Sequence, residues 1–263
     1  MRTALTIAGS DSGGGAGIQA DLKTFAAHGV YGTSAITAVT AQNTLGVTAW
    51  EAVSTDLVVA QIEAVAADIG ADAVKTGMLA NAAIVAAVAS TIHRLALPRL
   101  VVDPVMIAKG GDRLLDQSAV EAIRQQLLPL AHVVTPNIPE AEVLGNVTIT
   151  SLEDMRTAGR AILSLGPRLV LVKGGHLQSE ESIDIACTAD GCFEFRSARV
   201  DTVHTHGTGC TLAAAIAANL ANGLDDREAI GRAKAYLDGA IRHAPRIGGG
   251  HGPLEHFWRT PSG

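Results

Sequence analysis

A glycine-rich turn with the sequence THGTGCT (residues 205–211) runs directly into an alanine-rich stretch at residues 212–220. Glycine allows backbone angles that other residues reach only at a cost, and alanine favours a helix. The N-terminus of a helix presents unpaired N–H groups and the positive end of the helix dipole. An anionic oxygen or a transferring phosphoryl group can bind there. We therefore interpret four residues as a candidate anion hole: Gly207, Thr208, Gly209 and Cys210.

Cys210 falls in the first turn of that expected helix. A helix N-terminus favours the thiolate, so we expect the pKa of Cys210 to be lowered toward neutrality, which makes it a candidate general base. The alternative is a small buried residue that starts a core helix, since buried cysteines are usually inert. The spacing alone does not decide between the two.

Polar residues follow five of the expected strands at the point where each strand ends. Ligands of open α/β sheets bind beyond the carboxyl ends of the strands, so we expect these residues to converge at one edge. Turn chemistry accounts for Asn, Asp, Gly and Pro, but not for two lysines and a glutamine. The pattern therefore favours a binding site built from Gln42-Asn43, Lys75-Thr76-Gly77, Asp103-Pro104, Thr135-Pro136-Asn137 and Lys173-Gly174-Gly175.

The elements that would position these residues alternate along the chain. Strands are expected at residues 4–8, 34–40, 47–54, 73–75, 100–103, 133–135 and 169–173, with a hairpin at 183–195. Helices are expected at residues 18–28, 56–69 with Asp56 as the cap, 82–95, 118–128, 151–165 and 227–243, and after the Gly207 turn. This alternation predicts one α/β domain over residues 1–263, with a mostly parallel central sheet and helices on both faces.

Composition narrows the class of partner. The formal net charge is −6 and no run of like charges is present, so nucleic acid and membrane surfaces are not expected partners. No apolar stretch reaches the roughly 18 residues of a membrane span, and the N-terminus lacks a signal-peptide layout. Cys187 and Cys192 flank an expected turn and can lie near each other, but three cysteines in so long a chain argue for reduced thiols. We expect a cytoplasmic protein that binds small molecules.

Several familiar motifs are absent from the sequence. The glycine loop at residues 9–17 lacks the Gly-Lys-Ser/Thr ending of a Walker A loop, and neither glycine cluster fits a dinucleotide fingerprint. No His or Cys set has zinc spacing, and we interpret His204 and His206 as hydrogen-bonded packing groups. A serine nucleophile elbow is also missing, which leaves hydrolysis by a nucleophilic cysteine as the alternative.

Phosphoryl transfer makes use of the remaining groups. It depends on positioned positive charge, a metal ion that bridges phosphates, and a group that orients the attacking hydroxyl. Lys173 can neutralise a nucleotide phosphate, and Glu140, which lies close to Asn137, can hold Mg²⁺ directly or through water. Glu140 follows Pro139, so the competing interpretation is an ordinary acid in the first turn of a helix. We assign nucleotide binding to Lys173, Asn137 and Thr208, and metal binding to Glu140.

Seven stretches carry a resemblance to a known family. They are residues 8–24 (AGSDSGGGAGIQADLKT), 40–44 (TAQNT), 75–79 (KTGML), 103–106 (DPVM), 135–142 (TPNIPEAE), 172–176 (VKGGH) and 206–211 (HGTGCT). Together they resemble the hydroxymethylpyrimidine and phosphomethylpyrimidine kinases of thiamine biosynthesis, which belong to the ribokinase-like superfamily. The resemblance covers nearly the whole chain and implies a ribokinase-like fold.

The resemblance implies a specific reaction. ATP, with Mg²⁺, would phosphorylate 4-amino-5-hydroxymethyl-2-methylpyrimidine to its monophosphate and then to the diphosphate. Asp21 and Gln42 would hydrogen-bond the aminopyrimidine, whose edge offers both a donor and an acceptor. Met78 and Val105 would line the faces of the ring, and Cys210 would lie beside the hydroxymethyl group. The family's habit also implies a homodimer through strands near residues 47–54.

Two other functions remain as alternatives. A pyridoxal kinase is the alternative enzyme, although residues 105–112, which resemble the family's mobile loop, lack the second cysteine that some dual-specificity relatives carry there. A non-catalytic pyrimidine sensor would not require the intact glycine turn together with Lys173 and Glu140. Residues 250–257 resemble the family's ending, for which the sequence suggests only a loop near the nucleotide side. No thiamine-phosphate synthase segment follows, so we expect the stand-alone form.

Overall fold

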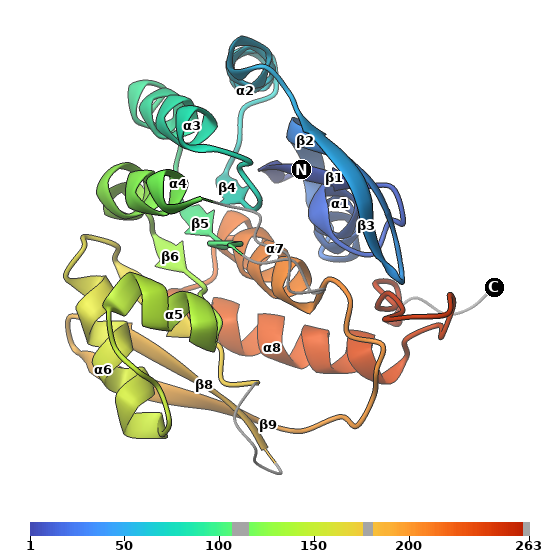
Figure 1. The fold of residues 1–263 in the computed structure, drawn as a ribbon, viewed down its shortest axis with the longest axis vertical. Coiled ribbons are helices and arrows are strands. Elements are labelled where there is room, and N and C mark those ends of the chain that lie inside the picture. The colour runs from blue at the N-terminus through green and yellow to red at the C-terminus, as the bar shows by residue number, and fades with distance from the viewer. Residues whose placement is uncertain (107–115, 176–180, 260–263) are drawn as a thin grey trace.

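The central feature of the computed structural model, which describes residues 1–106, 116–175 and 181–259, is one nine-stranded sheet (Figure 1). The strand order is β3-β2-β1-β4-β5-β6-β7-β8-β9. Strands β2, β1, β4, β5, β6 and β7 run parallel, whereas β3 at one edge and β8 and β9 at the other are antiparallel to their neighbours. The predicted α/β fold with a mostly parallel sheet is confirmed.

The central strands are short and buried. Each residue of β4, β5, β6 and β7 is buried, as expected for parallel strands that are covered on both faces. The strands are β1 (Thr3–Asp11), β2 (Tyr31–Asn43), β3 (Gly46–Ala52), β4 (Ala73–Thr76), β5 (Leu100–Val102), β6 (Val133–Val134), β7 (Leu169–Val172), β8 (Glu181–Thr188) and β9 (Gly191–Ala198).

Helices cover both faces of the sheet, and each face has its own hydrophobic core (Figure 1). One face carries α1 (Gly17–Ala27), α7 (Thr208–Ala221) and α8 (Asp226–Arg242). The other carries α2 (Thr55–Asp68), α3 (Ala82–Arg94), α4 (Gln117–Ala122), α5 (Ile138–Gly145) and α6 (Leu152–Leu163). All residues of α7 from Thr211 onward are buried. Its alanines allow this helix to lie close against the sheet beneath the candidate site.

The structure corrects two predicted helices. Asp56 lies in the first turn of α2, and Ser54 occupies the N-cap position in its place. The helix predicted at residues 118–128 is instead α4 followed by a π-helical turn (Ile123–Leu127) and a 3₁₀ turn (Leu128–Leu130). Pro129 has no N–H to continue an α-helical ladder, which fits the change of helix type there.

The expectation of reduced thiols at Cys187 and Cys192 is wrong in this structure, where a disulfide joins them. The two residues are directly opposite each other in the antiparallel β8–β9 pair. Hairpin register brings the cysteines together whatever the number of cysteines in the chain. Cys210 is free. In the part of the chain that the structure describes, no helix is long and apolar enough to cross a bilayer.

Candidate active site

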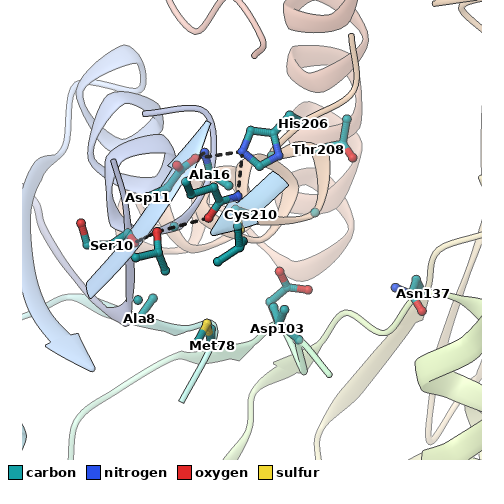
Figure 2. A pocket seen from close by; sticks show the side chains of 18 of the residues that line it. Ala8, Ser10, Asp11, Ala16, Met78, Asp103, Asn137, His206, Thr208 and Cys210 are labelled. Atoms are coloured by element: carbon teal, nitrogen blue, oxygen red, sulfur yellow. Dashed lines mark hydrogen bonds and ion pairs between the residues drawn. The ribbon is translucent and has the colours of Figure 1, made fainter. Parts of the chain in front are cut away.

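A cavity of about 450 Å³ opens at the carboxyl ends of the parallel strands (Figure 2). The residues that line it include one from each of the five polar strand ends, namely Gln42, Lys75, Asp103, Asn137 and Lys173. The predicted convergence of these strand ends is therefore confirmed. Figure 2 shows Asp11 and His206 on one side of the cavity and Asp103 and Asn137 on the other.

The glycine turn forms the N-terminal end of α7 and lines the same cavity. Gly207 is the N-cap residue and has a φ of 83°, a left-handed conformation that favours glycine. A Cβ atom on Gly207 would lie 1.8 Å from the carbonyl oxygen of Gly15, so a larger residue does not fit. Thr208, Gly209 and Cys210 open the helix, where backbone N–H groups have no partner within the helix. The turn thus has the backbone arrangement that an anion hole requires.

Cys210 lies in a different electrostatic environment from the one its sequence position predicts. Burial raises the pKa of its thiol to about 11, against the opposing attraction of Lys75. Asp21 and Asp103 raise this pKa further, whereas a hydrogen bond with the backbone of Gly17 lowers it. The predicted depression toward neutrality is wrong because burial, reinforced by Asp21 and Asp103, outweighs Lys75 and the backbone bond of Gly17. Cys210 is therefore a neutral thiol at pH 7.

Lys75 and Asp21 form a buried ion pair next to Cys210. Lys75 Nζ is 2.8 Å from Asp21 Oδ2, and both side chains are fully buried. Thr6 donates a hydrogen bond of 2.6 Å to the same carboxylate oxygen. Burial lowers the pKa of Lys75, but the attraction of Asp21, Cys210 and Asp103 together with the hydrogen bond to Asp21 outweighs this effect and raises the pKa above its ordinary value. Lys75 therefore stays charged and contributes a fixed positive charge to the cavity wall.

Asp21 is placed differently from its expected position at the pyrimidine. Lys75 lines the cavity, whereas Asp21 lies behind it and is not part of the lining. Its Oδ1 atom has no hydrogen-bond partner among the described residues. Asp21 is therefore the counter-ion of Lys75. In this structure it does not reach the cavity, where a ligand would bind.

Lys173 also lines the cavity, together with the carboxylates of Asp103 and Glu140. Lys173 Nζ is 2.9 Å from Asp103 Oδ1. Glu140 and Asn137 form a capping box at the start of α5, in which each side chain accepts a hydrogen bond from the other residue's backbone N–H. Burial raises the pKa of Glu140 to about 7, while Lys173 opposes and Asp103 reinforces the shift. Glu140 thus is a first-turn helix acid, as the competing interpretation held, and it also faces the cavity.

Gln42, Met78 and Val105 line the cavity on the side of the first glycine loop. Gln42 Nε2 is 3.3 Å from His206 Nε2, and Thr40 donates a hydrogen bond of 3.3 Å to Gln42 Oε1. The hydrogen bond from Thr40 holds the amide at the cavity wall, and His206 Nε2, which donates to Asp11, packs against it. Of the loop predicted at residues 105–112, residues 107–112 lie outside the described residues.

Asp11 and His206 are site residues to which sequence reasoning gave no functional role. Asp11 accepts hydrogen bonds from His206 Nε2 at 2.8 Å and from the backbone N–H groups of Gly13, Gly15 and Ala16. Burial raises the pKa of Asp11, but the bonds from His206 and the backbone outweigh it and hold the pKa below its usual value. His206 is a hydrogen-bonded packing group, as predicted, and it also lines the cavity. The sequence does hold one signal for Asp11, because a carboxylate inside a glycine-rich loop can accept hydrogen bonds from the backbone N–H groups of that loop.

Comparisons with known proteins place this arrangement among kinases. The family model for phosphomethylpyrimidine kinase matches residues 11–255. The hydroxymethylpyrimidine/phosphomethylpyrimidine kinase of Rhizobium meliloti is 53% identical over 259 residues, which cover 97% of each chain. The bifunctional thiamine biosynthesis protein ThiED of Geobacter sulfurreducens is 52% identical over 96% of this chain, which spans only 52% of that relative. The ADP complex of Bacillus subtilis pyridoxal kinase superposes with a TM-score of 0.90 at 39% identity and covers 97% of both chains.

Proposed function

The chain belongs to the phosphomethylpyrimidine kinase family, and we propose that it transfers phosphoryl groups from ATP to 4-amino-5-hydroxymethyl-2-methylpyrimidine and then to its monophosphate in thiamine biosynthesis. The activity named for the Rhizobium relative, which matches over nearly its whole length, supports this substrate. The ADP bound by the Bacillus relative supports ATP as the phosphoryl donor. The observation that carries the proposal is that Gln42, the glycine turn and Lys173 all line the same cavity.

The pyrimidine would occupy the wall formed by Gln42, Met78 and Val105. The Gln42 amide has both a donor and an acceptor group, which matches the edge of an aminopyrimidine. Met78 is flexible and polarisable, and its sulfur makes favourable contacts with aromatic rings. The hydroxymethyl group would then point to the glycine turn and Cys210.

The nucleotide phosphates would occupy the opposite wall. Lys173 would exchange its bond with Asp103 for a phosphate, and Asn137 and Thr208 lie at the same cavity. Phosphoryl transfer is catalysed mainly by positioning and by fixed charge. The N–H groups of Gly207 to Cys210, at the positive end of the α7 dipole, are placed to stabilise the charge that develops during transfer.

Glu140 and Asp103 fit the binding of Mg²⁺ through phosphates. Among the described residues, no group of three or more His, Cys, Asp or Glu side chains forms a metal site. Mg²⁺ usually keeps several waters and is held by one or two carboxylates together with substrate phosphates, and Asp103 and Glu140 near Lys173 match that mode. When bound, the ion would neutralise charge on the phosphates.

Cys210 is the proposed general base. It would act through the small fraction of thiolate that coexists with the thiol. The proton of the hydroxymethyl oxygen would pass to Cys210 Sγ as that oxygen bonds to the γ-phosphorus of ATP, while the bond from this phosphorus to the bridging oxygen breaks and ADP leaves. The attraction of Lys75 favours the thiolate over the thiol. Lys75 therefore supports the base from the cavity wall.

Two further parts of the proposal concern the whole protein. We propose a homodimer through β3, because this strand ends the sheet and carries an exposed Trp50. An unpaired edge strand offers backbone groups to a second chain. We also propose that the protein acts in the cytoplasm.

Turnover of two alternative acceptors, each supplied alone, tests the proposed reaction. The purified protein is supplied with ATP, Mg²⁺ and equal concentrations of either hydroxymethylpyrimidine or pyridoxal, and ADP release is measured with a coupling enzyme. We expect a higher kcat/KM for the pyrimidine. A Lys173→Met variant prepared in parallel should be nearly inactive, which excludes a contaminating kinase. Turnover of pyridoxal alone would overturn the proposed substrate, and turnover of neither would favour a sensor.

A further inference from the structure

Residues 248–253, with the sequence GGGHGP, cross the molecule between two parts of the candidate site, and we call this segment the strap. On one side, the strap is hydrogen-bonded to Thr44. The His251 N–H donates a hydrogen bond of 2.9 Å to the Thr44 carbonyl, and the Gly250 N–H donates one of 3.3 Å to the Thr44 hydroxyl. Thr44 follows β2, which carries Gln42, and Figure 1 shows the red C-terminal segment beside the β2–β3 hairpin. The strap is thus bonded to the wall proposed for the pyrimidine.

The other side of the strap holds the chain just before the glycine turn. His206 donates its N–H to the Gly252 carbonyl at 3.2 Å, and His206 and Pro253 form a parallel bridge. His251 Nδ1 is 2.9 Å from the Val203 carbonyl oxygen. Because Gly207 follows His206 directly, the strap also fixes the entry to the glycine turn. The sequence suggested a loop near the nucleotide side, whereas these contacts place the strap beside Gln42 and His206.

Close backbone approach explains three of the four glycines of the strap. A Cβ atom on Gly250 would lie 2.1 Å from the Thr44 carbonyl oxygen, and one on Gly252 would lie 2.5 Å from a ring nitrogen of His204. Gly248 has a φ of 82°, and its Cβ would lie 2.3 Å from the Thr44 hydroxyl. A Cβ on Gly249, in contrast, would meet only Leu45 at 3.8 Å, an ordinary contact. The strap therefore needs glycine at Gly248 and Gly250 to lie this close to Thr44, and at Gly252 to lie this close to His204. It does not need glycine at Gly249.

We infer that the strap is a positioning element for the phosphoryl acceptor, because it holds Thr44 and His206 at a fixed separation and thereby aligns Gln42 with the glycine turn. This inference rests on the proposed function. The reacting atoms of a bimolecular transfer must lie within about 3 to 3.5 Å, and a misplacement of about 1 Å can cost roughly 100-fold in rate. His206 transmits the alignment directly, since its ring contacts both Gln42 and Asp11. Among the described residues, no hydrogen bond joins the strap to Lys173 or Glu140, so nucleotide binding should not depend on it.

Adjacent glycines provide a matched test. Gly250→Ala and Gly249→Ala each add one methyl group to neighbouring positions, but only the first meets the Thr44 carbonyl. We expect Gly250→Ala to lower kcat/KM for the pyrimidine at least 10-fold, with KM for ATP within twofold of wild type. Gly249→Ala should stay within twofold in every constant. If Gly250→Ala does not fold, His251→Ala keeps the backbone and removes only the bond to the Val203 carbonyl. His251→Ala should lower kcat/KM for the pyrimidine by about threefold and leave KM for ATP within twofold of wild type.

Hydrogen exchange separates failure of the strap from failure of the proposed function. In Gly250→Ala the amide of His251 and the amides of residues 205–207 should exchange faster than in wild type, and in Gly249→Ala they should not. The inference is overturned if the two alanine variants have equal kcat/KM and equal exchange, or if Gly250→Ala weakens ATP as much as the pyrimidine. If wild type turns over no pyrimidine, the proposed function fails. The exchange of these amides then decides whether the strap holds the two segments together.

Discussion

The pH dependence of phosphoryl transfer tests whether Cys210 acts as the base. Burial raises the pKa of its thiol to about 11, so the thiolate is the minor form throughout the neutral range. With that pKa, the thiolate fraction is roughly 10⁻⁴ at pH 7 and roughly 10⁻² at pH 9. Because this pKa lies above the whole range, the thiolate fraction keeps increasing as the pH rises and does not level off. A thiolate base therefore predicts a rate that grows about tenfold per pH unit between pH 7 and 9, or about 100-fold in total.

The assay is single-turnover phosphorylation by rapid quench, with enzyme and ATP in excess over the pyrimidine, from about pH 6 to 9. Cys210→Ala should lower the rate by roughly 100-fold or more, since general-base help is typically worth ~10²- to 10⁴-fold, and should flatten the profile. Cys210→Asp should restore part of the rate, because a carboxylate is a base at these pH values. Calorimetry of both ligands with each variant controls for lost binding.

One pair of results would refute the thiolate reasoning. If wild type shows no pH dependence between 7 and 9 and Cys210→Ala stays within a few-fold of it, the backbone N–H groups of the turn supply nearly all of the catalysis. A loose transition state with little need for a base would permit this outcome. Cys210 would then be a structural residue of the turn.

Three other substitutions test separate parts of the site. Gln42→Leu should leave the pyrimidine edge unpaired and weaken its binding by about 1 to 3 kcal/mol with ATP affinity unchanged, and unaltered pyrimidine affinity by calorimetry would remove Gln42 from the site. Lys75→Met should destabilise the fold by about 3 to 5 kcal/mol in urea denaturation, because it leaves the buried Asp21 without its partner. Adding Asp21→Asn should recover part of that loss, and no recovery would mean that the ion pair is not the cause. Glu140→Gln should abolish the pH dependence of Mg-ATP affinity, which in wild type should increase as the pH rises through about 7 and Glu140 ionises. Equal dependence in both proteins, measured by titration at pH 6 and 8, would exclude Glu140 from metal binding.

The sequence predicted the framework of the site because its signals are local. Alternating apolar strands and helices predict a parallel sheet, and a parallel sheet brings its strand ends to one edge. The sequence pattern therefore predicts that Lys75, Asp103 and Lys173 lie together, and all three line the cavity. The glycine turn at Gly207 is equally local, since its conformation and the helix that follows depend on adjacent residues.

The interactions that the sequence did not predict join distant residues. The family resemblance implies that Asp21 binds the pyrimidine, whereas its partner in the structure is Lys75, 54 positions away. The pKa of Cys210 is raised by burial and by Asp21 and Asp103, whereas the local sequence reveals only that the residue lies at a helix N-terminus. The number of cysteines suggested free thiols, whereas the register of two strands places Cys187 opposite Cys192. Burial and charge pairing at a distance require the folded structure.

A phosphorus NMR time course tests the central claim most directly, because it identifies the products. The protein is incubated with 4-amino-5-hydroxymethyl-2-methylpyrimidine, ATP and Mg²⁺, and the spectrum is followed until ATP is consumed. The account predicts a monophosphate ester first, and then the two coupled resonances of a pyrimidine diphosphate as the monophosphate declines. A spectrum that shows only ATP and its hydrolysis products, while the same protein converts pyridoxal to its phosphate, would contradict it.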